Sequence, residues 1–244
     1  MIRDSITYLI ALVVIICLFI FTVNSPSNKT KDSNISPAHV EVVKLNSFEQ
    51  KSRAASVKIE TPSGGHGTGT LFSYRGKTLI FTAKHVVMEG DIYFAIANSG
   101  EIKVAKLLHT DSSADFAVLL VDDFETIKPV KFKKYNYKPK NLVDLRIIFS
   151  GYPSVHSLLT SRGRVAGFEV DSLIIHSVAW GGSSGSSIFS SNGDFIGILF
   201  GVSVDTPFGF PALIDNIIWV APYYSIDWAS LDDKISEEKN ELKR

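Results

Sequence analysis

The chain has 244 residues, 45% of them hydrophobic, and its 25 lysines and arginines balance 25 aspartates and glutamates. This zero net charge argues against bulk electrostatic attraction to nucleic acid or anionic lipid, and the length suits one two-lobed all-β domain. The single cysteine, Cys17, lies in an apolar N-terminal run, which excludes a disulfide and a catalytic thiol from the rest of the chain.

The first 23 residues predict a membrane anchor. From Ile6 to Val23 the chain carries no charge, and such a run is about long enough to cross a bilayer as one helix. A cleaved signal peptide is the alternative, but Val23-Asn24-Ser25 is a poor cleavage site. Because the basic residues on the two sides are nearly balanced, the short N-terminal tail decides the expected orientation, with the folded domain exported to the periplasmic or extracellular side.

The segment after the anchor, residues 24–40, is polar and rich in Ser, Asn and Lys, which predicts a flexible linker. Residues 41–239 are expected to form the folded domain, with a short helix near Val40–Lys51. Short runs of β-branched and aromatic residues then alternate with Gly, Ser and Asn-Gly turns, a pattern typical of a β-barrel. A terminal helix is predicted at 224–239, after Pro222.

The predicted strands fall into two groups, separated by a connector at about 126–142. The first lobe, at about 55–125, is expected to hold strands at Ala55–Glu60, Gly67–Phe72, Thr78–Thr82, Ile92–Ala97, Glu101–Leu108 and Phe116–Val121. The second lobe, at about 143–222, is expected to hold strands at Leu145–Ser150, Gly163–Phe168, Ser172–Ser177, Ser187–Ser190, Phe195–Val202 and Ile217–Ala221.

The connector between the lobes is rich in lysine. Lys128–Lys140 contains six lysines interleaved with Phe132, Tyr135 and Tyr137, and such interleaving can bind nucleic acid or acidic lipid. Its position between the lobes favours a solvated linker, so we expect no nucleic-acid partner.

Three segments in the order His, Asp, Ser predict a catalytic triad. His85 ends the segment Thr82–His85, Asp115 precedes an apolar strand, and Ser184 lies among the glycines of Gly181–Gly185. A serine hydroxyl needs an imidazole to take its proton, and a carboxylate must orient that imidazole and stabilise its charged form. The backbone N–H groups of Gly182 and Ser184 are the expected donors of an oxyanion hole.

Two other orders of catalytic residues do not fit this chain. Gly181–Gly185 also matches the G-x-S-x-G turn of α/β-hydrolases, with Ser183 as nucleophile. Those enzymes need a later histidine, and none follows Ser183. A subtilisin order could be assembled from Asp91 and His109, but the alternating strands and long helices of that fold are missing.

The remaining ionisable candidates are less favoured. Asp111 is close enough in sequence to replace Asp115, which is preferred because an apolar strand follows it directly. His66 could line the cleft, although a structural role is favoured. We expect no metal and no other cofactor, because the spacing of three further histidines indicates no metal site: His109, His156 and His176.

These motifs resemble those of trypsin-like serine proteases. Gly67–Phe72 and Leu79–Val87 look like the strand pair that delivers the catalytic histidine, and Asp115 resembles the family's aspartate. Gly151-Tyr152-Pro153 and the stretch 160–165 are similar to the start of the second barrel in HtrA-like proteases. Two further segments resemble both that group and the glutamyl endopeptidases: Ser184–Phe189 and Gly193–Ile198.

The resemblance covers roughly residues 55–230 and implies an all-β fold of two six-stranded antiparallel β-barrels. It also implies that His85, Asp115 and Ser184 hydrolyse peptide bonds through an acyl-enzyme, with a protein or peptide as substrate. Ser187 replaces the usual proline after the serine motif. About sixty residues follow Ser184, so no PDZ domain of the HtrA kind is expected.

Activation by a newly cut N-terminus is not expected. Residue 183 is Ser, whereas digestive trypsin-like enzymes carry there the aspartate that pairs with the new terminus. No start of the Ile-Val-Gly-Gly type is present either.

The substrate pocket is assigned by position in the same resemblance. Val178 and Ala179, before the nucleophile, are expected to form its floor, and the segment Ile198, Leu199 and Phe200 its wall. Leu199 stands where similar glutamyl endopeptidases carry a histidine, and no charged group is evident. An apolar P1 residue of the substrate is the resulting hypothesis.

Two other classes of function remain open from the sequence. The chain could be a catalytically silent protease-fold module that binds peptides, although all three triad positions are filled. It could also be a membrane-tethered scaffold that uses the lysine-rich connector to bind an anionic partner. Its oligomeric state is not predicted.

Overall fold

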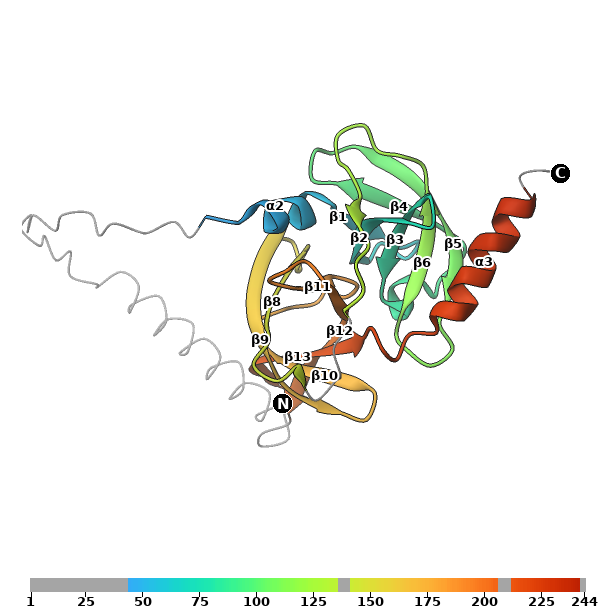
Figure 1. Cartoon of the computed structure of the whole chain (residues 1–244). Helices are drawn as coiled ribbons and strands as arrows, with labels where there is room; N and C mark the ends of the chain where they lie inside the picture. The colour runs from blue at the N-terminus through green and yellow to red at the C-terminus, as the bar shows by residue number, and fades with distance from the viewer. Residues whose placement is uncertain (1–43, 136–140, 206–211, 242–244) are drawn as a thin grey trace, which may run out of the picture. The chain divides into compact units, whose positions relative to one another are not determined.

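The computed structural model describes residues 44–135, 141–205 and 212–241, which form two β-barrels, helix α2 and helix α3 (Figure 1). The predicted anchor at 1–23 and linker at 24–40 lie outside the described residues. Within the described ranges, no helix combines the length and the apolar character that crossing a membrane requires.

The first barrel is closed and antiparallel, in the order β1-β4-β5-β6-β3-β2, with β2 paired back to β1. Strand alternation builds its interior: on β4, Tyr93 and Ala95 are buried, whereas Phe94 between them is half exposed. The six strands are β1 Ser56–Glu60, β2 His66–Tyr74, β3 Lys77–Thr82, β4 Ile92–Ala97, β5 Ile102–Thr110 and β6 Ala117–Val121.

The second barrel is also closed, in the order β10-β13-β12-β11-β8-β9, and its strand pairs are antiparallel. Register shifts interrupt several pairs, as between Ile174 and Ile175 on β10, which locally increases the twist that closure requires. The six strands are β8 Arg146–Gly151, β9 Leu159–Glu169, β10 Ser172–His176, β11 Ser187–Ser190, β12 Phe195–Asp205 and β13 Ala212–Pro222.

A cluster of aromatic rings joins the two barrels and α3 (Trp228–Glu241). Phe72 of β2 meets Phe195 of β12 edge-on at 5.7 Å. Phe132 of the connector packs 4.9 Å from the ring of Trp228, at the start of α3. Each such pair contributes about 0.5–1.5 kcal/mol beyond area burial, and buried hydrophobic residues of both barrels belong to one core cluster.

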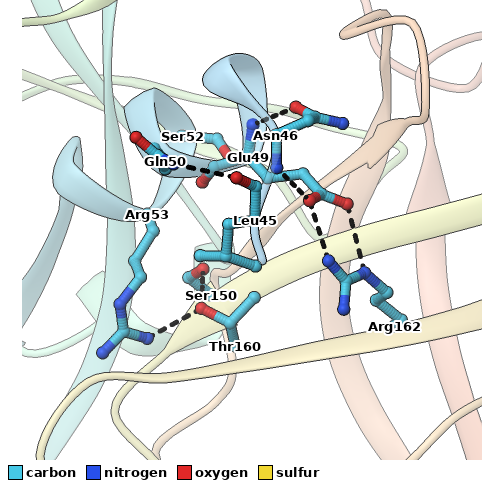
Figure 2. Close-up of polar contacts among 9 residues, drawn as sticks. All are labelled: Leu45, Asn46, Glu49, Gln50, Ser52, Arg53, Ser150, Thr160 and Arg162. Atoms are coloured by element: carbon cyan, nitrogen blue, oxygen red, sulfur yellow. Dashed lines mark hydrogen bonds and ion pairs between the residues drawn. The ribbon is translucent and has the colours of Figure 1, made fainter. Parts of the chain in front are cut away.

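Helix α2 (Ser47–Ala54) precedes the first barrel in sequence but is fastened to the second (Figure 2). Its N-terminus forms a capping box, in which Asn46 and Glu49 exchange hydrogen bonds. Glu49 also accepts two hydrogen bonds from Arg162 on β9, at 3.1 and 2.8 Å. Arg53 donates to the Thr160 hydroxyl and the Leu158 carbonyl, both at 2.7 Å.

The predicted fold of two six-stranded antiparallel barrels with a C-terminal helix is confirmed. Two details differ. The terminal helix begins at Trp228 rather than Tyr224, because Ser225 bonds back to the Pro222 carbonyl in a turn. The predicted first helix begins at Ser47 and continues to Ala54; the part of that prediction before residue 44 is outside the described residues.

The interpretation of the connector as a simple solvated linker is wrong for its described part. Its lysines are exposed, but Val130 and Tyr135 are buried. A short strand, β7 (Val130–Lys131), adds to β2 in parallel, so that Phe72 faces Val130 in register. Burial of the aromatic side chains outweighs the local polarity of the segment.

Candidate active site

His85 and Asp115 form a close pair at the end of the first barrel. Nδ1 of His85 lies 2.7 Å from Oδ2 of Asp115, and the backbone N–H of His85 donates to Oδ1 at 3.1 Å. Burial alone would raise the pKa of Asp115, but the hydrogen bonds and charge of His85 together outweigh it and lower that pKa below 3.8. Asp115 is therefore ionised at neutral pH and can orient the imidazole.

The turn that follows β3 presents the histidine. Thr82 ends the strand and donates its hydroxyl to the Thr68 carbonyl of β2 at 2.8 Å. A short 3₁₀ helix, η1 (Lys84–Val87), follows directly. Val86 and Val87 are buried in it, whereas the His85 side chain is 41% exposed. Burial of these two valines fixes the turn and leaves the imidazole accessible to solvent.

Asp111, which the sequence leaves as a competitor to Asp115, has a different place. It is fully buried. Its Oδ1 accepts the backbone N–H groups of Ser113 and Ala114, both at 2.8 Å, and its Oδ2 accepts that of Asp227 at 2.7 Å. Its carbonyl also accepts from Lys84 Nζ at 2.8 Å. Asp111 thus holds the two segments that carry His85 and Asp115, a role that sequence spacing alone did not reveal.

Ser184 lies in a turn that needs two left-handed glycines. Gly182 has φ +89° and Gly185 has φ +90°, values that side-chain-bearing residues rarely adopt. Backbone bonds from Ser183 N to Trp180 O and from Ser186 N to Ser183 O close the turn at 2.9 and 3.1 Å.

The turn packs against the segments that lead to His85. The Ser184 carbonyl accepts the N–H of Thr68 at 2.7 Å. A methyl group placed on Gly185 would overlap the Thr68 carbonyl and the Thr82 hydroxyl. The described hydrogen bonds therefore join His85 to Asp115 and Ser184 to β2, and none of them links His85 directly to Ser184.

The backbone around Ser184 leaves two donors available. Within the described part of the chain, the N–H groups of Gly182 and Ser184 have no acceptor. The Gly182 carbonyl, by contrast, accepts from the Thr68 hydroxyl at 2.8 Å. The Nε2 atom of His66 lies 2.9 Å from the Tyr152 carbonyl, which agrees with the structural role that the sequence favours for this residue. Thr68 therefore holds the carbonyl of Gly182, while the N–H of Gly182 makes no hydrogen bond among the described residues.

The expected pocket residues differ in exposure. Ile198 and Leu199 are buried in the second barrel and Ala179 is nearly so, whereas Phe200 is partly buried and Val178 is 39% exposed. The Leu199 backbone accepts from Gly185 N at 2.7 Å and donates to Ser186 O at 3.0 Å. The predicted wall is thus bonded to the Ser184 turn. Val178 lines a hollow of about 580 Å³ whose walls include arginines.

Known proteins share both sequence and fold with this chain. The trypsin-like peptidase domain matches residues 67–198. The probable periplasmic serine endoprotease DegP-like of Rhizobium meliloti (strain 1021) is 30% identical over 171 residues, covering 62% of this chain and 33% of that protein. The chain therefore spans about a third of the length of this curated relative.

Solved structures support the same fold. The serine endoprotease of Yersinia pestis aligns with a TM-score of 0.59 at 22% identity, over 80% of this chain and 67% of that one. The HtrA-type protease AlgW aligns at 0.59 and 16%, over 72% and 59%. The inactive form of the Rv3671c protease aligns at 0.57 and 20%, over 74% and 89%. At these identities the likeness establishes the double-barrel fold.

Proposed function

The chain belongs to the trypsin-like peptidase family, and we propose that it is a serine endopeptidase with His85, Asp115 and Ser184 as its catalytic triad. The single observation that carries the proposal is the His85–Asp115 pair, with Nδ1 and Oδ2 at 2.7 Å. A histidine oriented by a carboxylate, on a segment packed against the Ser184 turn, supports a role in activating the serine hydroxyl.

The chemistry divides among these groups as follows. With its Nδ1 proton directed at Asp115, the imidazole keeps Nε2 free to take the proton of the Ser184 hydroxyl as it attacks the peptide carbonyl. The backbone N–H groups of Gly182 and Ser184 receive the negative charge that develops on the carbonyl oxygen. The imidazolium then protonates the departing amine, and water hydrolyses the acyl-enzyme by the same route.

The proposal also covers the location of the protein at a membrane and the P1 residue of its substrates. An N-terminal anchor at residues 1–23, followed by a linker at 24–40, would hold the domain of 41–239 at the exported face of a membrane. The curated relative from Rhizobium meliloti is described as periplasmic, which supports the exported side. An apolar P1 residue is proposed because the pocket positions Val178, Ala179 and Leu199 are all apolar.

Labelling with a fluorophosphonate probe tests the catalytic assignment. The full chain in detergent should label, and Ser184→Ala should abolish labelling, whereas Ser191→Ala, in an exposed turn of the second barrel, should label like wild type. Persistent labelling of Ser184→Ala would remove Ser184 from the mechanism. A wild-type chain that does not label but binds peptides would instead support the silent module.

Cleavage of a peptide library by the same preparation tests the pocket. We expect most cleavage after apolar residues. A preference for acidic or basic residues at P1 would contradict the apolar pocket while leaving the triad proposal intact.

A further inference from the structure

Three basic side chains stand in a row across the second barrel. Arg146 of β8 lies directly opposite Arg164 of β9, and Arg164 lies directly opposite His176 of β10. All three residues are exposed on the barrel surface. Like charges directly opposite one another destabilise a sheet, so the two arginines are unfavourable neighbours unless an anion lies between them.

The row opens onto the hollow of about 580 Å³ that Val178 also lines. Ser161, Ser177 and Asn216 supply further polar groups to its walls, and none of the described residues that line it is an aspartate or a glutamate. A site of this composition offers guanidinium, amide and hydroxyl donors, together with positive charge. Such a set of groups matches the oxygen atoms of an anion rather than a cation or an apolar ligand.

The ion pairs of the neighbourhood leave part of this charge uncompensated. Arg162, which also lines the hollow, is turned to Glu49 of α2 (Figure 2). Arg164 pairs with Asp144 at 2.7 Å, but the Asp144 side chain is 78% exposed and takes one guanidinium only. Among the described residues, Arg146 has neither an ion-pair partner nor a hydrogen-bond acceptor. The guanidinium of Arg146 is therefore available to a ligand.

We propose that this hollow binds a phosphate-type oxyanion between Arg146 and Arg164. The planar guanidinium group presents two parallel N–H donors to two oxygen atoms, which makes arginine the preferred partner of phosphate. A bound oxyanion replaces the repulsion between the two arginines by two attractions. Free phosphate and the phosphoryl headgroup of a lipid present the same oxygen atoms, so both are possible sources.

Thermal unfolding measures the site without relying on proteolysis. The full chain is prepared in detergent as the Ser184→Ala variant, and its Tm is compared with and without 10 mM inorganic phosphate at constant ionic strength. A Kd of about 1 mM would multiply the statistical weight of the folded state by about 11. For a domain of this size, that corresponds to a rise of about 3–6 °C in Tm.

Arg146→Gln, in the same background, is the decisive variant. It should abolish the phosphate-dependent rise, and in phosphate-free buffer it should melt no lower than its parent, because it removes a repulsion. Arg75→Gln is the matched control: it removes an exposed arginine of the first barrel that pairs with Asp232, and it should keep the full rise.

The other possible results test the site and identify the source of its ligand. No rise in the parent protein, an equal rise in Arg146→Gln, or an equal loss in Arg75→Gln would overturn the site. A lower Tm of Arg146→Gln without phosphate would contradict the claim that Arg146 is uncompensated. Arg146-dependent binding to vesicles with phosphatidic acid, but not to pure phosphatidylcholine, would identify a lipid headgroup as a source; a Tm rise without vesicle binding would identify soluble phosphate.

Discussion

One carboxylate holds both the ring and the backbone of its partner: Asp115 contacts Nδ1 of His85 through Oδ2 at 2.7 Å and the backbone N–H of His85 through Oδ1 at 3.1 Å. Because both oxygens act on the same residue, the imidazole has little freedom to rotate away. The bond also selects the tautomer with the proton on Nδ1.

The first prediction concerns that tautomer. Asp115→Asn should lower kcat by about 10⁴-fold, because an amide can donate to Nδ1 and thereby stabilise the wrong tautomer. Steady-state hydrolysis of a fluorogenic peptide measures this loss. Asp122→Asn, an exposed residue after β6, is the control and should retain wild-type rates. A loss below tenfold in Asp115→Asn would contradict the assigned role.

Asp111 gives a second prediction, because its two oxygens serve different segments. Asp111→Ala removes all three hydrogen bonds and should lower kcat by about 100-fold with little change in KM, the loss expected when a catalytic group shifts by about 1 Å. Asp111→Asn keeps one oxygen atom that can accept the N–H groups of Ser113 and Ala114. Its kcat should therefore be at least tenfold higher than that of Asp111→Ala.

A variant at Asp232 separates positioning from stability in this experiment. Asp232 fastens α3 to Tyr74 and Arg75 of the first barrel without touching the catalytic segments. Asp232→Asn should therefore lower Tm while leaving kcat close to wild type. If kcat falls in proportion to Tm in the same way for the Asp111 and Asp232 variants, the loss of activity reflects stability alone and Asp111 has no positioning role.

The third prediction concerns the turn around the nucleophile. Gly182→Ala forces a φ of +89° on alanine and places its methyl group 2.5 Å from both His66 Nε2 and the Tyr152 carbonyl. The turn must shift, and loss of one oxyanion donor costs about 100- to 1000-fold in rate. Gly181→Ala, whose added methyl group meets no atom within 4 Å, is the control. Equal fluorophosphonate labelling rates for the two variants would contradict the proposed oxyanion hole.

The fourth prediction concerns the pH dependence of stability. The hydrogen bonds of Arg162 are the largest cause that lowers the pKa of Glu49 below 4.5. A group with a lowered folded-state pKa stabilises the fold above its ordinary pKa, and that contribution disappears as pH falls through the folded value. Glu49→Gln should therefore cost about 1–2 kcal/mol at pH 7, and the cost should shrink as pH falls below 4.5.

Urea unfolding at several pH values checks this contribution. Glu60→Gln is the matched control, because Glu60 also pairs with a cation, Lys58, but with its side chain 42% exposed. Its cost should be below about 1 kcal/mol. A constant difference between wild type and Glu49→Gln from pH 7 to pH 3 would contradict the account of the Glu49–Arg162 pair.

Local pattern was sufficient to predict most strands. Ile92–Ala97 and Ser187–Ser190 were predicted with the bounds that the structure has, because alternation and flanking turns are properties of the segment itself. Strand β7 was not predicted, since its two residues pair in parallel with β2. Phe132 likewise has no periodic pattern around it, and only the rings of distant segments explain its place.

The candidate site was also predicted only in part. The sequence predicted His85 and Asp115 as partners, and the structure brings them into contact. It preferred Asp115 to Asp111, because an apolar strand follows Asp115 directly, but it did not reveal the hydrogen bonds by which Asp111 holds the neighbouring segments. The row of Arg146, Arg164 and His176 was also missed, since it exists only through the register of three strands.

The attachment of α2 also bears on synthesis of the chain. Glu49 and Arg162 are separated by 113 positions, so α2 leaves the ribosome long before β9, which carries Arg162, is synthesised. Because domains are built from the N-terminus during translation, the first barrel can close while α2 still lacks its acceptor. In the nascent chain, α2 therefore has no Arg162 to bind until β9 has been synthesised. Folding of the second barrel then fixes the position of the N-terminal end of the folded domain.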